Sequence, residues 1–377
     1  MRYYSCDSHV VEGREVFEGL EARFGERAPR IIRDYEGRPG DWLILPGVGP
    51  IPVGRLGIAG NRLDDPKTHE RIARGYDGLN PGVRDPAKRL DEQAQDGIVG
   101  EVMYASLNMF TYAMPDKEVA TAVFQRHNDW LRDYCSVAPE RLIGIGCLPV
   151  PDIEGSLAEI QRAAKRGVRG FMIPAHVSPT QPYCDPAYDK LWAVAEELRL
   201  PLTMHIFTGT SPDAGLPAHW GTPGGAIKGY TFAHTTVANT VIDLICGGVV
   251  ERFPGLKFIV SEYETGWLGH FLKRLDHAIY RTPKFAVDYL TMKPSEYFRR
   301  NFLATFEDDL EGIQTRDSIG VECLVWGNDY PHHDAIWPHS MAVLSRIMAG
   351  VPAADVERIC FQNAVDLYHI DVSKLPA

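Results

Sequence analysis

Side chains that can bind a metal ion follow several apolar segments of this chain. The segment Cys323–Trp326 is apolar, and Gly327 ends it. Asp329 follows, and Pro331 prevents further strand pairing. α/β enzymes often carry a catalytic carboxylate where a buried strand ends and the chain turns into a loop. Asp329 could equally form a turn or cap the next helix, so the rest of the chain decides between these roles.

Four further residues of the same kind lie at the ends of other apolar segments. Asp7 and His9 end the first segment, and their alternation places both side chains on one side of a strand. His205 ends the fifth segment and Glu262 the sixth. Such histidines and carboxylates around one axis suit one divalent metal ion, zinc first, then manganese or iron(II). A turn, a core histidine or an ion pair would explain each residue alone, but not their positions on separate strands.

The elements that must position these residues alternate between strand and helix. Eight apolar runs read as strands buried on both faces, and most are followed by a helical pattern. This alternation predicts a parallel sheet, and eight such units close into a (β/α)8 TIM barrel more readily than they form an open sheet. The predicted strands are 3–7, 100–106, 142–150, 168–174, 200–206, 256–261, 302–306 and 323–326. The predicted helices are 85–95, 116–137, 152–166, 186–198, 236–252, 267–279, 309–318, 340–348 and 353–367.

One long segment between the first strand and the first helix does not fit this alternation. Residues 10–85 are irregular, with glycine and proline concentrated at 37–53 and charged residues at 62–74. Because the segment is too long for a simple loop, we interpret it as an insertion that covers or shapes a site. The chain 1–377 is then predicted to be a single barrel domain that carries this insertion.

The composition of the chain argues against several classes of partner. Hydrophobic residues make up 45% of the chain, and a net charge of −11 disfavours binding to nucleic acid or to an anionic membrane surface. We find no signal-peptide pattern, and no apolar run approaches the roughly 18 residues of a membrane span. The seven cysteines are scattered without a Cys-x-x-Cys pair, which is typical of reduced thiols. We therefore expect a cytoplasmic protein that acts on a small molecule.

Several motifs together resemble those of the amidohydrolase superfamily. The resemblance is to amidohydrolase family 2, the branch similar to aminocarboxymuconate-semialdehyde decarboxylase, and covers about residues 3–370 except much of 10–85. It implies a barrel with one catalytic metal, held by His9, His205 and Asp329, and it implies a homodimer. Asp329 would also act as a base. The motifs that carry it are Asp7-Ser8-His9, 170–175, 185–200, 200–205, 255–262 and 326–332.

The sequence departs from the family pattern at two positions. Asp7 stands where the family commonly has histidine or glutamate, and it can still supply an oxygen ligand. Glu262 replaces the catalytic histidine that follows the sixth strand in the family. The fourth strand also lacks the terminal lysine that binuclear members carboxylate, which implies one metal ion.

Three functions compete for this site. In a hydrolase, a metal-activated water attacks a carbonyl, Asp329 accepts the proton of the water, and Glu262 donates to the leaving group. In a non-oxidative decarboxylase of a small aromatic or unsaturated acid, Asp329 or Glu262 supplies the proton that replaces carbon dioxide. Because Glu262 replaces the family histidine, we place the hydrolase first. A metal-free barrel that serves as a scaffold is disfavoured by the intact ligand set.

Further residues are predicted to contribute to the site. His234 is predicted to be catalytic, although it could equally lie in a loop. Substrate contacts are predicted for His176, after the fourth strand, for the aromatic Trp220, and for His332. Arg274 is predicted to bind a substrate carboxylate across a subunit contact, with a surface ion pair as the alternative.

Overall fold

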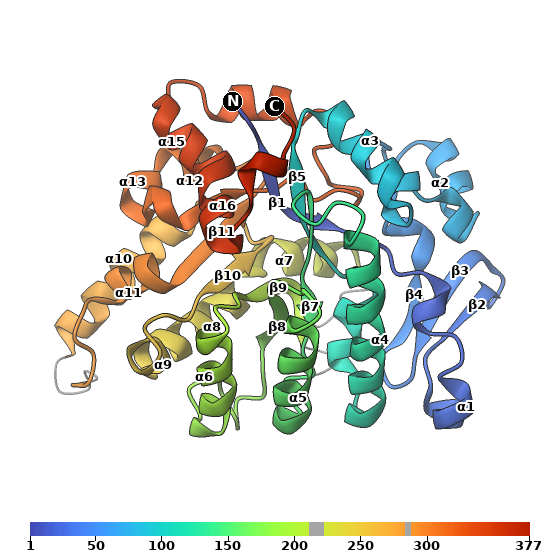
Figure 1. The fold of residues 1–377 in the computed structure, drawn as a ribbon, viewed down its shortest axis with the longest axis horizontal. Helices are drawn as coiled ribbons and strands as arrows, with labels where there is room; N and C mark the ends of the chain where they lie inside the picture. Colours follow the sequence, from blue (N-terminus) through green and yellow to red (C-terminus); the bar gives the residue numbers. More distant parts are fainter. Residues whose placement is uncertain (211–221, 283–287) are drawn as a thin grey trace.

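The computed structural model describes residues 1–210, 222–282 and 288–377. In these ranges, parallel strands surround a central apolar core and helices cover the outside (Figure 1). The strands follow one another around the barrel in chain order. They are β1 (Tyr4–His9), β5 (Gly100–Tyr104), β6 (Leu142–Gly144), β7 (Gly146–Cys147), β8 (Phe171–His176), β9 (Leu202–Gly209), β10 (Phe258–Ser261), β11 (Phe302–Phe306) and β12 (Leu324–Trp326).

Strands β6 and β7 together form the third strand of the barrel. β1, β5 and β6 make one parallel sheet, and β7 to β12 make the other. The single residue Ile145 separates β6 from β7, and its N–H still donates to the carbonyl of Met103 at 2.9 Å. The predicted strand 142–150 is therefore interrupted at Ile145, and it ends at Cys147.

The first and last strands close the barrel. The N–H of Asp329 donates to the carbonyl of Asp7 at 2.8 Å, and the N–H of His9 donates to the carbonyl of Tyr330 at 2.6 Å. Ser8 also forms a parallel bridge with Tyr330. With β6 leading directly into β7, these bonds join the two sheets, so the predicted (β/α)8 fold is confirmed.

Aspartates at the N-caps explain where several outer helices begin. The carboxylate of Asp85 accepts the N–H groups of Ala87 and Lys88, and Asp116 and Asp152 cap α4 and α5 in the same way. The outer helices are α3 (Pro86–Asp96), α4 (Lys117–Cys135), α5 (Ile153–Ala164), α6 (Asp189–Glu197), α8 (His234–Cys246), α9 (Val249–Arg252), α10 (Leu268–Arg281), α12 (Leu310–Gln314), α13 (Arg316–Ile319), α14 (Ser340–Ile347), α15 (Ala353–Glu357) and α16 (Asn363–Tyr368).

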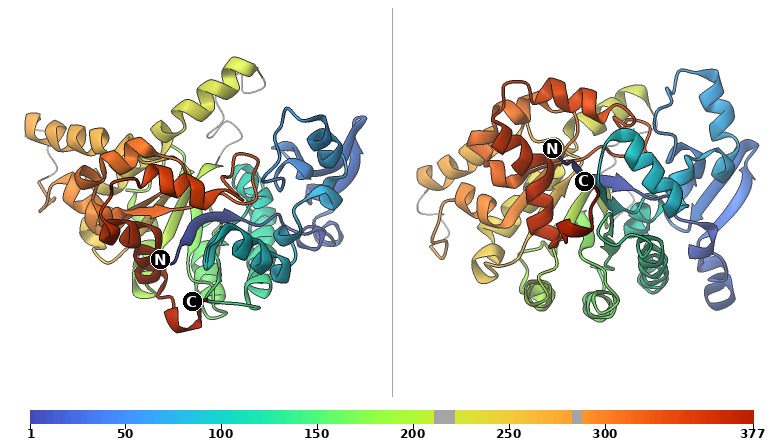
Figure 2. Two further views of the ribbon diagram at one scale, coloured as in Figure 1. Left: turned by 90° about the horizontal axis from the view of Figure 1, so that it is seen from above. Right: turned by 45° about the horizontal axis from the view of Figure 1, so that its top comes forward.

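Outside residues 10–85, two helices of the described ranges were not predicted from the sequence. They are α7 (Pro223–Phe232), which projects from the body of the molecule (Figure 2), and α11 (Pro294–Asn301). Both begin with proline, which favours the first helical position, but neither has a long apolar stripe. Across the described ranges, no helix is both long enough and apolar enough to cross a membrane.

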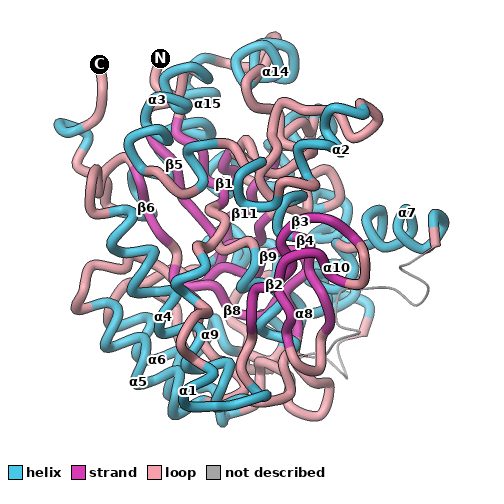
Figure 3. Tube along the Cα trace, turned by 90° about the vertical axis from the view of Figure 1, so that its right-hand side faces the viewer, coloured by secondary structure: helices cyan, strands magenta, loops and turns pink. Residues whose placement is uncertain are grey.

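Residues 10–85 contain regular structure, which corrects the expectation of an irregular segment. β2 (Arg30–Tyr35), β3 (Arg38–Leu45) and β4 (Gly49–Pro52) form an antiparallel sheet beside the barrel (Figure 3), with α1 (Glu21–Phe24) and α2 (Pro66–Ile72). Glu36 and Gly37 join β2 to β3, both with positive φ, as a tight two-residue hairpin requires.

Apolar packing attaches this segment to the barrel. Phe17 and Leu43 share one buried cluster with Val119 and Val123 of α4. The N–H of Ala59 also donates to the carbonyl of Pro331, in the loop after β12, at 2.9 Å. The insertion therefore supports the loop that carries Asp329.

Candidate metal and catalytic site

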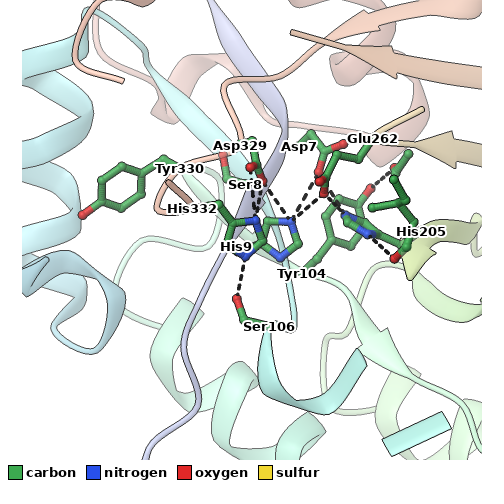
Figure 4. Close-up of polar contacts among 12 residues, drawn as sticks. Asp7, Ser8, His9, Tyr104, Ser106, His205, Glu262, Asp329, Tyr330 and His332 are labelled. Carbon is green, nitrogen blue, oxygen red and sulfur yellow. Dashed lines mark hydrogen bonds and ion pairs between the residues drawn. The ribbon is translucent and has the colours of Figure 1, made fainter. Parts of the chain in front are cut away.

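Six ionisable side chains converge at the C-terminal ends of the barrel strands (Figure 4). They come from the last half of β1, from the middle of β9, from the residue after β10, and from the loop after β12. Four donor atoms in each of two overlapping groups lie within 4.8 Å of one another. The groups are Asp7, His9, His205 and Glu262, and His9, Glu262, Asp329 and His332.

The imidazoles of His9 and His205 turn their Nε2 atoms towards the carboxylates. His205 Nε2 lies 3.3 Å from Asp7 Oδ1 and 3.4 Å from Glu262 Oε2. His9 Nε2 lies 3.3 Å from Asp329 Oδ1, and 3.7 Å from both Asp7 Oδ1 and Glu262 Oε2. All five side chains are at least nine-tenths buried, so water does not screen these contacts.

A backbone carbonyl fixes which nitrogen of His9 carries hydrogen. His9 Nδ1 lies 2.8 Å from the carbonyl oxygen of Ala105, and since a carbonyl oxygen can only accept, Nδ1 is the donor and Nε2 of the neutral ring presents a lone pair. His205 has an acceptor at each ring nitrogen, the carbonyl of Ile206 at Nδ1 and Asp7 Oδ1 at Nε2. The backbone of metal-binding histidines commonly orients them in this way.

The lone pair of His9 Nε2 meets carboxylate oxygens that also lack donors. Among the described residues, His9 Nε2, Glu262 Oε2 and Asp329 Oδ1 are buried without a hydrogen-bond partner. Buried acceptors that face one another are unfavourable unless a cation lies between them. The residues present therefore fit a divalent metal ion.

The pKa shifts of the acidic groups agree with this reading. Burial raises the pKa of Glu262 well above its usual range, and the charge of Asp7 adds to the effect. Burial also raises the pKa of Asp329, with Glu262 as the largest charged contribution. Burial lowers the pKa of His9, and the neighbouring His332 lowers it further. Crowded carboxylates resist ionisation without a cation, and a bound cation removes that penalty.

Thr305 links two members of the site, although the sequence analysis missed it. Its Oγ1 donates to Asp7 Oδ2 at 2.6 Å and accepts the N–H of Glu262 at 2.8 Å. The available signal was a polar residue near the end of the apolar run 302–306.

Asp329, His332 and Ser106 form a hydrogen-bonded chain beside the metal-binding residues. His332 Nδ1 lies 3.1 Å from Asp329 Oδ2, and His332 Nε2 lies 3.1 Å from Ser106 Oγ. Burial lowers the pKa of His332 to about 3. Ser106, which follows β5, was also missed by the sequence analysis. The structure places the predicted substrate residue His332 against Asp329.

A buried arginine holds the strands that carry the site. Arg89 of α3 pairs with Glu101 of β5, with Nε 2.6 Å from Oε2. Its Nη1 donates to the carbonyl of His9 at 2.8 Å, and its Nη2 to that of Tyr330 at 3.4 Å. Arg89 therefore joins α3 and β5 to both sides of the closure between β1 and β12.

Three predicted residues within the described ranges do not join either four-donor group. His234 begins α8, and its ring lies 5.4 Å from that of Trp267. His176 ends β8, where its Nδ1 is buried without a partner among the described residues. Arg274 lies on the exposed side of α10, and Trp220 lies outside the described residues. Their predicted roles remain predictions.

Solved structures similar to this chain share its fold. An amidohydrolase of Mycobacterium avium subsp. paratuberculosis K-10 superposes with a TM-score of 0.75 at 21% identity, covering 97% of this chain and 99% of that one. A dihydroxybenzoic acid decarboxylase of Polaromonas sp. JS666, solved with bound manganese and the inhibitor 2-nitroresorcinol, gives a TM-score of 0.65 at 18% identity, covering 98% and 97%.

Curated relatives correct the order of the functional hypotheses. Gamma-resorcylate decarboxylase of Rhodococcus jostii (strain RHA1) is 27% identical over 293 residues, which cover 72% of this chain and 84% of the relative. Other relatives are also named as decarboxylases. The hydrolase that we placed first is therefore wrong, and the error came from treating the missing family histidine as evidence against decarboxylation.

A family model assigns the chain as a whole. The model described as Amidohydrolase matches residues 79–370, which include every strand from β5 to β12. The name of this family does not fix the reaction, since the decarboxylases above are similar to the same chain. With this match and the (β/α)8 barrel, the chain belongs to the amidohydrolase family.

Proposed function

We propose that this protein is a metal-dependent, non-oxidative decarboxylase of a small aromatic or unsaturated carboxylic acid. The observation that carries the proposal is the set of buried acceptor atoms that face one another, His9 Nε2, Glu262 Oε2 and Asp329 Oδ1. This arrangement suits a cation, and the relatives that are similar over most of their length are named as decarboxylases.

Asp7, His9, His205 and Asp329 would hold the metal ion. Oxygen donors in this set suit manganese, which the Polaromonas structure contains, while imidazole donors suit zinc and iron as well. When bound, a divalent cation supplies positive charge that orients a carboxylate and stabilises charge developing on substrate oxygens. The buried walls of the site exclude water and strengthen these interactions.

Asp329 is the proposed proton donor. Decarboxylation breaks the bond between the carboxylate carbon and the ring or alkene carbon, and carbon dioxide leaves. The electron pair left on that carbon forms a bond with a proton from the Asp329 carboxyl group. His332 Nδ1, 3.1 Å from Asp329 Oδ2, holds that group in place, and Ser106 holds the far side of the imidazole.

The proposal is tested by carbon dioxide release from the purified, manganese-loaded protein. The panel contains 2,6-dihydroxybenzoate, other hydroxybenzoates and unsaturated dicarboxylates, with matched amides and lactones. We expect release from at least one acid, and loss of both metal and activity in His205→Ala. Asp329→Asn should lower kcat by about 100-fold or more. His270→Ala, on the exposed surface of α10, is the matched control and should retain activity.

Two results would contradict the proposal. Manganese-loaded protein that cleaves only amides or lactones would show that the reaction is hydrolysis. Unchanged turnover of an acid by Asp329→Asn would remove Asp329 from the proton transfer.

A further inference from the structure

Glu262 occupies a position that neither the resemblance nor the relatives explain. It follows β10, and it replaces a family histidine that is not among the metal ligands implied by the resemblance. Both four-donor groups contain it, whereas Asp7, His205, Asp329 and His332 each belong to one group only. A metal ion in either group would therefore lie within reach of Glu262.

One oxygen of the Glu262 carboxylate lacks a hydrogen bond. Oε2 is buried without a partner among the described residues, and the side chain is 9% exposed. Its nearest polar neighbours include His205 Nε2 at 3.4 Å and His9 Nε2 at 3.7 Å. His9 Nε2 presents a lone pair, because its Nδ1 faces a backbone carbonyl, and it has no hydrogen-bond partner among the described residues. A buried carboxylate oxygen that faces such a lone pair needs a cation as their common partner.

The backbone holds Glu262 in this place despite a conformational cost. Its φ is +63°, in the left-handed region that non-glycine residues rarely adopt. The N–H of Glu262 donates to Thr305 Oγ1 at 2.8 Å, and the same oxygen donates to Asp7 Oδ2 at 2.6 Å. One threonine thus sets the positions of two carboxylates, and a strained backbone of this kind is common at functional sites.

We infer that Glu262 is a ligand of the metal ion rather than a proton donor to the substrate. The inference rests on the metal site of the proposed function. With Asp7 and Asp329, Glu262 gives a set of three carboxylates and two imidazoles. That set exceeds the four ligands typical of zinc and favours manganese, which accepts oxygen donors at higher coordination numbers. Glu262 therefore contributes to metal selection in this chain.

The test measures binding of Mn²⁺ and Zn²⁺ to metal-free protein by calorimetric titration, with metal content checked by elemental analysis. Glu262→Gln keeps the size of the side chain and removes the charge. We expect its Kd for Mn²⁺ to rise about 100-fold, since even partners behind metal ligands contribute 10- to 100-fold. The Kd for Zn²⁺ should rise less, and the electron paramagnetic resonance spectrum of bound Mn²⁺ should change. Glu311→Gln, on exposed α12, is the matched control.

Controls separate this inference from the metal site itself. Wild-type protein that binds no metal would overturn both proposals. Loss of Mn²⁺ in His205→Ala with a Kd within about threefold of wild type in Glu262→Gln would overturn only the inference about Glu262. Thermal unfolding of each metal-free variant shows whether the change is confined to metal binding.

Discussion

At the scale of single residues, a substitution of Ser106 tests how the orientation of the His332 imidazole affects the reaction. Its Oγ lies 3.1 Å from His332 Nε2, on the side of the imidazole away from Asp329. Ser106→Ala should keep the metal content and lower kcat about fivefold, since a hydrogen bond of this type contributes about 1 kcal/mol. Steady-state kinetics with elemental analysis would check this. An unchanged kcat would mean that the position of His332 does not depend on Ser106.

A second residue, Glu12, holds the loop that carries Ser106. Its carboxylate accepts the N–H groups of Leu107 at 2.8 Å and Asn108 at 3.0 Å, and His127 Nδ1 lies 3.4 Å away. Burial raises the pKa of Glu12 to about 7. The folded protein therefore keeps a proton that the unfolded chain loses above about pH 4.5.

This shift predicts a pH dependence of stability. The contribution of Glu12 is fully present below its unfolded pKa and is lost as pH rises through about 7. Between pH 5 and 8 the unfolding free energy of wild type should fall by about 2–3 kcal/mol relative to Glu12→Gln. Urea titrations at several pH values would measure this difference. A constant difference across the range would show that Glu12 is ionised throughout.

The sequence could reveal those site residues that have a metal-binding side chain and also stand at the end of an apolar run. Asp7, His9, His205 and Asp329 have ligand side chains and end apolar runs, and the structure brings them together. Thr305 has no distinctive chemistry, so only its contacts show that it joins Asp7 to Glu262. The order of hydrolase and decarboxylase depended on one missing histidine, and that single residue was too little to decide a reaction.

At the scale of elements, the buried side chain of Arg89 joins α3 to the strands that close the barrel, β1 and β12. Replacing Arg89 with Met would leave Glu101 buried without its main partner, which costs about 3–5 kcal/mol. The double variant Arg89→Met with Glu101→Leu removes both charges and should recover most of this loss. Urea unfolding would measure both variants. If Arg89→Met lowered the unfolding free energy by less than about 1 kcal/mol, then Gln93 and Ser8, which also donate to Glu101, would be sufficient partners for its carboxylate.

The elements differed in how far their sequence pattern predicted them. The barrel strands are buried on both faces, so each is a continuous apolar run in the sequence and can be recognised from it. β2 is exposed or half-buried along its length, and its sequence Arg-Ile-Ile-Arg-Asp-Tyr carries no such run. Its pairing with β3 depends on the hairpin turn at Glu36-Gly37, which a composition-based reading treats as part of a loop.

At the scale of the whole molecule, metal binding should stabilise the fold, because the proposed ligands come from strands around the barrel. An ion that binds only the folded state at 100 times its Kd adds about 2.7 kcal/mol to the unfolding free energy. Chelation should therefore lower the unfolding temperature, and Mn²⁺ should restore it. Differential scanning calorimetry would measure both, and His205→Ala should show no response. A wild-type protein insensitive to metal would contradict this.

Assembly beyond one chain is the least constrained prediction. The homodimer follows only from the resemblance to the family, and the large hydrophobic side chains exposed on the described surface, such as Ile227 and Tyr280, lie on different helices. Sedimentation of the purified protein would measure the oligomeric state.

The closure of β1 against β12 has a consequence for the order of assembly during synthesis. Asp7 bonds Thr305 across 298 residues, and Ser5 bonds Asn328 across 323. Asp7 and His9, the first two proposed ligands, thus leave the ribosome long before β12, and loop closure over such distances is slow. A nascent chain lacking β12 has Asp7 and His9 but no Asp329 to face them. We therefore expect the chain to bind the metal ion tightly only after β12 and Asp329 have been synthesised.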